Sequence, residues 1–312
     1  MKSSSLIALV TLSGIVCHGA LADLPQAAVT IKTVDEDGQS VPGAMTGAAY
    51  NDSSSKSMVN LVKGLTDSSG LFLATAKTEG FVSYGATKEG YYKSVGEQGF
   101  SDVRGNRWQP WNPVIELVLK KIINPVPMYA RRAIIELPRL DTEAGFDLEA
   151  ADWVKPWGNG IQRDFVFRLT KRFASRNDYE AKLQLSFSHE GDGVQNVYVA
   201  NNSGSELRLP RNAPPDGYEA VWERTDACPN TVRVRPDQNY FFRVRTEMTD
   251  GKVRKACYGK IHGEIRFDVI NSKTAAIILT YYFNPDGTQN LEFDQKKNLF
   301  RNLKLSETPR LP

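Results

Sequence analysis

Ala181-Lys-Leu-Gln-Leu-Ser-Phe187 alternates apolar and polar side chains residue by residue. Successive side chains of a β-strand point to opposite faces, so this alternation predicts a strand with one buried face and one face in water. The same pattern occurs at residues 28–34, 165–169, 231–235 and 241–246. Asp-Gly turn signals separate these stretches, at 37–38, 192–193, 216–217, 250–251 and 286–287. Short strands joined by such turns predict an all-β fold made of two antiparallel β-sandwich domains.

The first 22 residues have the pattern of a secretory signal. Lys2 supplies a positive charge, an apolar run follows, and Ala20-Leu21-Ala22 places small residues at the two positions that a signal peptidase reads. Cleavage after Ala22 predicts a protein that is secreted or periplasmic. No later apolar run approaches the roughly 20 residues of a membrane-spanning helix, so we expect no transmembrane segment in the mature chain.

The charge of the chain argues against nucleic acid as a partner. The formal net charge is only +3 at pH 7, and no block of lysines and arginines stands out. We therefore expect an extracellular glycan or protein as partner, and the oligomeric state stays open.

The cysteines predict a disulfide. Cys17 leaves with the signal, which leaves Cys228 and Cys257 as an even pair in an oxidising compartment. A bridge between them is the favoured interpretation, and two separately buried thiols are the alternative.

A domain boundary is expected near Asn124-Pro-Val-Pro127. Residues 113–122 read as a closing strand, and a Pro-x-Pro segment after a strand gives an extended connection that cannot pair. This divides the mature chain into a first domain at 23–123, a second at 124–305 and a loose tail at 306–312. A short helix is possible at 296–303.

Three segments of the first domain follow a recognisable order. They are Val34-Asp-Glu-Asp-Gly-Gln-Ser-Val-Pro-Gly-Ala44, Thr66-Asp-Ser-Ser-Gly-Leu-Phe72 and Lys88-Glu-Gly-Tyr-Tyr92. Asp37-Gly38 can supply the positive φ that a hairpin turn needs. The Asp67 carboxylate can bond the backbone that follows it, and Gly70 can end that turn.

Together these segments resemble a carboxypeptidase regulatory-like domain, which is a transthyretin-like β-sandwich. The resemblance covers about residues 28–100 and leaves 124–312 unassigned to any family. It implies a non-catalytic accessory domain of secreted and outer-membrane proteins, with a tyrosine of the third segment entering the core. It does not imply carboxypeptidase activity.

Metal and cofactor chemistry is not predicted. The mature chain has only His189 and His262, and neither has the His-x-x-Glu spacing of a zinc carboxypeptidase. We therefore expect no cofactor. Calcium is a minor alternative, because acidic turns could offer oxygen ligands, although none has a complete calcium-loop spacing. These turns hold Asp35 with Asp37, Asp192, and Asn284 with Asp286.

The loop between Asp147 and Asp164 is a candidate binding site. It places Trp153 and Trp157 beside carboxylates such as Asp152, and tryptophan faces with nearby carboxylates suit a sugar ring. Trp108 and Trp111 form a second such pair. The favoured alternative is that these tryptophans close the ends of a sandwich, each indole N–H bonded to a carbonyl.

Four arginines form a second candidate site. Arg233 and Arg235 alternate with valines, as Arg243 and Arg245 alternate with Phe242 and Val244, and residues 236–239 suggest a hairpin between them. Period two would gather the four guanidinium groups on one face, where they suit an acidic glycan, phosphate or carboxylate. A solvated or salt-bridged outer face is the alternative.

Catalytic motifs are scarce. Glu292 and Asp294 would share one face of a strand, which is compatible with a carboxylate pair for glycoside hydrolysis and equally with an ordinary amphipathic strand. The sequence contains no Gly-x-Ser-x-Gly elbow and no P-loop. We predict a non-enzymatic binding protein for a glycan, a cell-envelope component or a partner protein. The alternatives are a glycan-active hydrolase and a structural component of a surface assembly.

Overall fold

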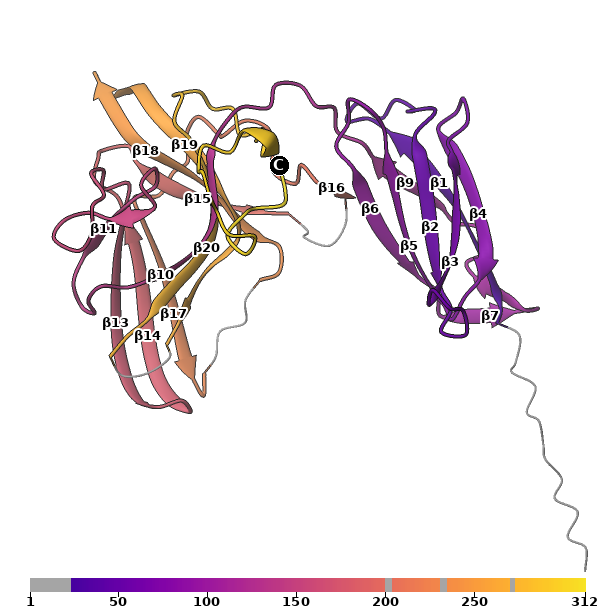
Figure 1. Cartoon of the computed structure of the whole chain (residues 1–312), viewed down its shortest axis with the longest axis horizontal. Helices are drawn as coiled ribbons and strands as arrows, with labels where there is room; N and C mark the ends of the chain where they lie inside the picture. The colour runs from indigo at the N-terminus through magenta and orange to yellow at the C-terminus, as the bar shows by residue number, and fades with distance from the viewer. Residues whose placement is uncertain (1–23, 200–203, 231–234, 270–272) are drawn as a thin grey trace, which may run out of the picture.

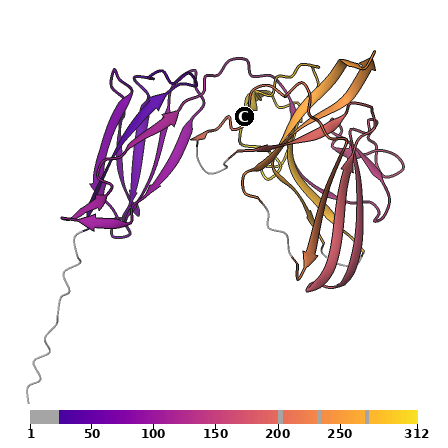
Figure 2. The same cartoon turned by 180° about the vertical axis from the view of Figure 1, so that it is seen from behind.

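The computed structural model describes residues 24–199, 204–230, 235–269 and 273–312, and these form two β-sandwiches. The sandwiches are separate in the front view (Figure 1) and in the view from behind (Figure 2). Apart from η1 (Gln295–Lys297), a short 3-10 turn, every regular element in these ranges is a strand. The all-β class with antiparallel sandwiches is therefore confirmed. No helix in the described ranges is long and apolar enough to span a bilayer.

The first sandwich contains two five-stranded sheets, ordered β4-β1-β8-β7 with β9 also paired to β1, and β16-β6-β5-β2-β3. Its strands pair antiparallel except that β8 and β9 run parallel to β1. The side chains of Ile31, Tyr50 and Val82 are fully buried between the two sheets. The strands of the first sheet are β1 (Gln26–Val34), β4 (Leu71–Lys77), β7 (Asp102–Arg104), β8 (Arg107–Gln109) and β9 (Val114–Val118). Those of the second are β2 (Met45–Asn51), β3 (Val59–Leu65), β5 (Phe81–Thr87), β6 (Ser94–Gly99) and β16 (Gly204–Ser205).

The turns of this sandwich form as their residues predict. Gly38 has a φ of +75°, and the Asp35 carboxylate accepts the backbone N–H groups of Asp37 and Gln39. In the second turn the Asp67 carboxylate accepts from Ser69 at 2.9 Å and from Leu71 at 2.8 Å, and Gly70 has a φ of +76°. Only glycine adopts such a φ without strain, which fixes where each turn ends.

The second sandwich packs the sheet β10-β20-β19-β18-β15 on the sheet β12-β11-β13-β14-β17. The predicted alternation is confirmed in β14, where Ala181, Leu183 and Leu185 are buried in the core between the sheets. The strands of the first sheet are β10 (Tyr129–Glu136), β15 (Gly193–Tyr198), β18 (Gln238–Thr249), β19 (Lys252–Asp268) and β20 (Ala276–Asn284). Those of the second are β11 (Ala144–Asp147), β12 (Asp152–Trp153), β13 (Phe165–Ser175), β14 (Asp178–Ser186) and β17 (Val221–Cys228).

Loops and the C-terminal segment cover part of the outer face of the β10-β20-β19-β18-β15 sheet. Phe241 and Tyr282 on that face pack against Leu291 and Phe293, which come from the chain after β20. The segment 306–312, which we expected to be loose, packs here instead. The Tyr282 hydroxyl donates to the Leu311 carbonyl at 3.0 Å, and Glu307 pairs with Arg131 at 2.7 Å. Similarly, the helix expected at 296–303 is reduced to the three residues of η1.

Several contacts join the two sandwiches across the connection that follows Val118. The buried Glu292 carboxylate accepts from the Tyr92 hydroxyl and from the backbone N–H groups of Ile123 and Asn124, each at 2.9 Å. Strand β16 adds to the edge of β6, so the second half of the chain completes a sheet of the first sandwich. The predicted boundary at residue 124 lies within this hydrogen-bonded connection.

The predicted disulfide between Cys228 and Cys257 is absent, and both thiols are unbonded. The two residues lie in different sheets. Cys228 ends β17, at the opposite end of the sandwich from the β18–β19 hairpin, near which Cys257 lies (Figure 1). Cys257 is buried in the core with its sulfur 3.8 Å from the Pro285 carbonyl oxygen. The even number of cysteines suggested a pair, but a count does not show how far apart two residues lie in the fold.

Candidate functional site

Trp153 belongs to the core of the second sandwich. Its indole N–H donates to the Glu136 carbonyl at 3.0 Å, and its ring packs edge-on against Phe146 and Phe167. The side chain is buried. This matches the alternative interpretation, in which a tryptophan closes the sandwich and bonds a carbonyl. Trp108 does the same in the first domain, where its N–H donates to the Thr78 carbonyl at 2.9 Å.

The carboxylates of this loop shape its backbone. Asp152 accepts from the Trp153 and Asn159 N–H groups, both at 2.8 Å. Asp147 accepts four backbone N–H groups at 2.8–3.1 Å, two from the beginning of the loop and two from its end. Only Trp157, with 38% of its surface exposed, remains available to a ligand. Asp152, Trp153 and Trp157 therefore do not combine into a sugar-binding platform.

The arginines of β18 point to opposite faces of the sheet, which corrects the prediction of one arginine surface. A bulge between Val244 and Glu247 gives Arg245 a φ of +56°. Its guanidinium lies over the Phe283 ring, on the core side, and binds both oxygens of the Asp164 carboxylate at 2.8 and 2.9 Å. Burial raises the pKa of Asp164, and the paired guanidinium opposes this shift. Period two fails here because the bulge adds a residue to one strand of the pair.

The other arginines are also separated. Arg243 is buried and donates to the Gly191 carbonyl at 2.7 Å and the Pro215 carbonyl at 2.9 Å. Arg235 is exposed, pairs with Asp237 at 2.9 Å and lies over the Tyr198 ring. Arg233 lies outside the described residues. A turn at 236–237 leads directly into β18, and most of the strand expected before it, at 231–234, lies outside the described residues.

The Glu292 and Asp294 carboxylates, considered as a pair for hydrolysis, have separate structural partners, and the carboxylates of the tryptophan loop lie elsewhere. Glu292 is buried at the domain junction, where its oxygens accept three hydrogen bonds. Asp294 caps η1 and lies 3.2 Å from the Lys297 ammonium. Both Asp152 and Asp164 lie in the second sandwich. Asp152 accepts the Asn159 N–H within the tryptophan loop, and Asp164 binds the Arg245 guanidinium. The two groups of carboxylates thus serve different parts of the fold.

The acidic side chains considered for calcium accept backbone N–H groups. Asp192 accepts from the Thr246 N–H at 2.8 Å, and Asp286 accepts from the Thr288 N–H at 2.7 Å. The described ranges hold no group of three or more His, Cys, Asp or Glu side chains that could ligate a metal ion.

A basic groove lies on the outer face of the second sandwich, on strands β10, β20 and β19. Strand pairing aligns Arg132 with Thr280, and Thr280 with His262, in one row across the three strands. The next row on this face aligns Ile134, Ile278 and Arg266. Side chains in such rows are neighbours, because paired residues face the same side of the sheet.

Two hollows form the basic groove, and they meet at Arg132, His262 and Thr280, which line both. The first has a volume of about 260 Å³ and also involves Arg235 and Arg266. The second has a volume of about 360 Å³ and extends under Arg310 of the C-terminal segment. Four arginines therefore surround the groove.

The charge of the basic groove is poorly compensated. In the described part of the chain no carboxylate oxygen lies within 4.0 Å of the guanidinium nitrogens of Arg132, Arg266 or Arg310. The one acidic residue in the lining, Glu264, forms an ion pair with Arg224. Arginine forks without protein partners at a concave surface suit an anion with several oxygens, such as a carboxylate or a phosphate.

His262 adds neutral hydrogen-bonding capacity at the centre of the groove. Both ring nitrogens are shielded from water and have no partner among the described residues. Burial lowers the pKa of His262 well below its ordinary value, and Lys260 and Arg208 add to this effect. The ring is therefore neutral at pH 7, with one donor and one acceptor nitrogen. A buried polar group without a partner is unusual and marks this position as a candidate contact.

Sequence reasoning missed this groove apart from Arg235. Arg132 and Thr280 are far apart along the chain, and Arg266 follows a bulge in β19 that begins at His262. The alternation in β10 shows that Arg132 shares a face with Ile134, but it does not reveal the register with β20. The only available signal was a set of polar residues on the outward positions of three separate strands.

Comparisons with known proteins do not assign a family. No family model matches the chain, and no curated protein matches it. Among solved structures, 3-chlorocatechol 1,2-dioxygenase from Rhodococcus opacus 1CP is 10% identical with a TM-score of 0.27, and the match covers 33% of this chain and 63% of that one. A single-residue mutant of catechol 1,2-dioxygenase from Acinetobacter radioresistens is 13% identical at the same TM-score of 0.27, with coverage of 33% and 54%.

A streptococcal ancillary pilin is 10% identical with a TM-score of 0.23, and the match covers 81% of this chain and 58% of the pilin. The chain thus spans less than two thirds of the length of each of these structures. Likenesses this weak do not indicate a function.

Proposed function

We propose that this protein is a secreted or periplasmic binding protein without catalytic activity, and that its ligand is an anionic component of the cell envelope. The ligand carries carboxylate or phosphate groups and binds in the basic groove. The observation that supports this is the set of three arginines, Arg132, Arg266 and Arg310, that face a concave surface without a carboxylate partner. The proposed location rests on the signal pattern of residues 1–22.

The basic groove suits binding more than catalysis. Its basic groups are arginines, which stay charged, and a histidine that is neutral at pH 7. The single carboxylate in the lining, Glu264, is held by Arg224 and also accepts the Arg235 N–H at 2.7 Å. These residues offer hydrogen bonds and positive charge to an anion. They do not include one group suited to act as a general acid and a second suited to act as a general base.

We also propose that the first domain is a carboxypeptidase regulatory-like accessory domain. Its support is the residue pattern of the three segments, together with the turns at Asp35–Gln39 and Asp67–Leu71, which form as that pattern requires. In this proposal the first domain positions the second domain and does not itself contact the anion.

The experiment that tests anion binding is calorimetric titration of the mature protein with three polymers. Polygalacturonate offers carboxylates, polyphosphate offers phosphates, and dextran offers neither. We expect one of the anionic polymers to bind and dextran not to bind. Affinity should fall as salt rises, because ions screen exposed charges.

Substitutions in the basic groove should weaken this binding. Arg132→Ala and Arg266→Ala each remove one charge-assisted contact worth about 1.5–3 kcal/mol, so each should weaken binding at least tenfold. Arg168→Ala is the matched control, because Arg168 is an exposed arginine on the other sheet of the same sandwich. Equal binding by the wild type and by the Arg132→Ala/Arg266→Ala double variant would reject the proposed site.

A further inference from the structure

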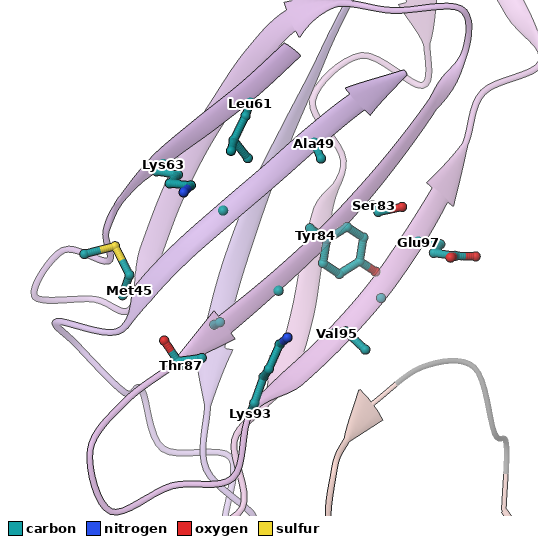
Figure 3. Close-up of a pocket in the computed structure, with 14 residues that line it drawn as sticks. Met45, Ala49, Leu61, Lys63, Ser83, Tyr84, Thr87, Lys93, Val95 and Glu97 are labelled. Atoms are coloured by element: carbon teal, nitrogen blue, oxygen red, sulfur yellow. The ribbon is translucent and has the colours of Figure 1, made fainter. Parts of the chain in front are cut away.

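A separate hollow lies on the outer face of the first sandwich, in the sheet β6-β5-β2-β3 (Figure 3). Its volume is about 480 Å³. Strand pairing places Lys63, Gly47, Gly85 and Val95 in one row across the four strands. The neighbouring row is Leu61, Ala49, Ser83 and Glu97. Small residues on the two central strands leave the middle of the face recessed.

The rim of this recess is apolar and exposed. Met45, Leu61 and Val95 expose 50%, 53% and 37% of their surfaces. Side chains of this kind rarely surround a concave surface on a soluble domain unless a partner covers them. Methionine at such a site adapts to differently shaped apolar partners.

The recess continues into the domain junction. Thr87 and Lys93 line both this recess and another hollow of about 480 Å³, which also involves Tyr91, Pro125 and Phe293. The walls at the junction are held by the Glu206 N–H, which donates to the Lys93 carbonyl at 2.8 Å, and by the pairing of β16 with β6. These two adjoining hollows are together called the sheet–junction groove.

Two lysines beside this groove, Lys63 and Lys93, have no carboxylate partner among the described residues. Among the described residues, no carboxylate oxygen lies within 4.0 Å of the Lys63 or Lys93 ammonium group. Lys63 stands on the β3 side of the recess and Lys93 on the β6 side (Figure 3). A ligand that places a carboxylate near the recess would therefore meet a positive charge from either side.

We propose that the sheet–junction groove binds an extended segment of a partner polypeptide. An aliphatic or aromatic side chain of that segment enters the recess above Gly47 and Gly85, and an adjacent carboxylate lies beside Lys63 or Lys93. Two adjoining hollows that share Thr87 and Lys93 suit an extended chain, and the Met45, Leu61 and Val95 rim suits an apolar side chain. This site is independent of the basic groove on the second sandwich.

Two other occupants fit less well. A sugar ring prefers an aromatic platform, whereas the rim is aliphatic. The one aromatic residue in the lining, Tyr84, alternates to the opposite face of the sheet from Gly85 and packs against the core. A second copy related by a twofold axis through this face would bring the same recess rather than a protruding side chain. An extended peptide can instead place one of its side chains in the recess.

The test fills the recess without straining the backbone. A Cβ added at Gly47 would lie 3.6 Å from the nearest atom, on the flexible Lys63 side chain, which is an ordinary contact. Gly47→Phe should therefore fold and occupy the recess. Gly99→Phe is the matched control, because Gly99 ends a strand of the same sheet, outside the recess, and a Cβ there meets nothing within 4 Å.

The probe is a library of short random peptides displayed on phage and selected against the immobilised mature protein. We expect selected peptides to combine a large apolar residue with Asp or Glu. Synthetic copies, measured by fluorescence polarisation, should bind Gly47→Phe at least about tenfold more weakly than the wild type and Gly99→Phe equally well. Thermal unfolding of both variants checks that they are folded.

Three outcomes would overturn the proposal. One is that no peptide is enriched, and another is that selected peptides bind Gly47→Phe as tightly as the wild type. The third is concentration-dependent dimerisation in sedimentation experiments that Gly47→Phe abolishes, since this would assign the recess to a second copy of the chain.

Discussion

Lys260 is a fully buried lysine next to the basic groove. It shares a row with Ala130 and Tyr282 on the outer face of the sheet, under the loops that follow β20. Its ammonium nitrogen donates to the Leu291 carbonyl at 2.6 Å and lies 5.1 Å from the centre of the Tyr282 ring. Burial lowers the pKa of Lys260 to about 7, and the nearby Glu292 carboxylate only partly opposes this shift.

This residue predicts that stability rises with pH above neutrality. The folded protein releases the Lys260 proton near pH 7, whereas the unfolded chain keeps it until about pH 10.4. Between these values the unfolded state binds more protons, so the free energy of unfolding increases by up to about 1.4 kcal/mol per pH unit. The stability that the folded protein gains from a neutral Lys260 is lost as pH falls through 7. Urea unfolding at several pH values from 7 to 9 measures it.

Lys260→Met isolates this effect, because it removes the titrating group while keeping a long apolar side chain. Its stability should be flatter with pH over the same interval. Lys182→Met, at an exposed lysine paired with Glu223, should keep the wild-type slope. Parallel curves for the wild type and Lys260→Met would show that Lys260 stays charged in the folded protein.

At the level of single elements, two turns of the first sandwich offer a matched comparison. Gly38 and Gly70 have nearly equal φ values, +75° and +76°. A Cβ at Gly38 meets nothing within 4 Å, whereas one at Gly70 would lie 2.7 Å from the Thr33 carbonyl oxygen. Gly38→Ala should cost about 1–2 kcal/mol for the left-handed conformation alone. Gly70→Ala should cost a further 1–3 kcal/mol or so, because the clash forces the backbone to move.

Urea unfolding of the two variants measures this difference directly. A larger loss of unfolding free energy in Gly70→Ala would show that the turn packs closely against β1 in addition to requiring a left-handed backbone. Equal losses would mean that the turn moves away from Thr33 at little cost, and that its packing against β1 contributes little.

Elements also mark the limit of what the sequence reveals. Local alternation predicted β14 and the burial of Ala181, Leu183 and Leu185, because strand period and burial are properties of neighbouring residues. It failed at Arg245, where a bulge turns the side chain onto the core face. Bulges depend on the partner strand, which the local pattern does not contain.

The candidate site was even less accessible to sequence reasoning. The basic groove depends on a register between β10 and β20 that joins residues almost half the chain apart, such as Arg132 and Thr280. The tryptophan loop, by contrast, was easy to recognise but serves the core through Trp153. The tryptophans, which stand out in the sequence, thus serve mainly to pack the core. The basic groove is formed instead by residues on separate strands that no local sequence pattern brings together.

At the scale of the whole molecule, the junction decides whether the two sandwiches act as one unit. Glu292 belongs to the second domain, and all three groups that donate to it come from Tyr92 and the connection at Ile123 and Asn124. Arg211 adds a bridge to Glu36 of the first domain at 2.8 Å. One wall of the proposed peptide groove is built on this junction, so its rigidity affects that site directly.

Glu292→Gln should loosen this junction. The amide turns a donor toward the backbone N–H group of Ile123 or Asn124, so at least one of these part-buried donors loses its acceptor. The loss should be about 2–4 kcal/mol, because hydrogen bonds to a buried charge are the stronger kind. Tyr92→Phe removes only one of the three bonds and should cost about half as much. Glu223→Gln, at an exposed carboxylate, is the control and should change stability by less than about 0.5 kcal/mol.

Scanning calorimetry combined with small-angle scattering tests this prediction. If the junction couples the domains, the wild type unfolds in one transition, and Glu292→Gln separates this into two as each sandwich unfolds alone. The maximum dimension in scattering should increase in the same variant, because the domains then sample more orientations. The contrary outcome is that Glu292→Gln matches Glu223→Gln in both measurements. In that case the domains are coupled by strand β16 and Arg211 rather than by Glu292. The peptide groove would then keep its shape without this carboxylate.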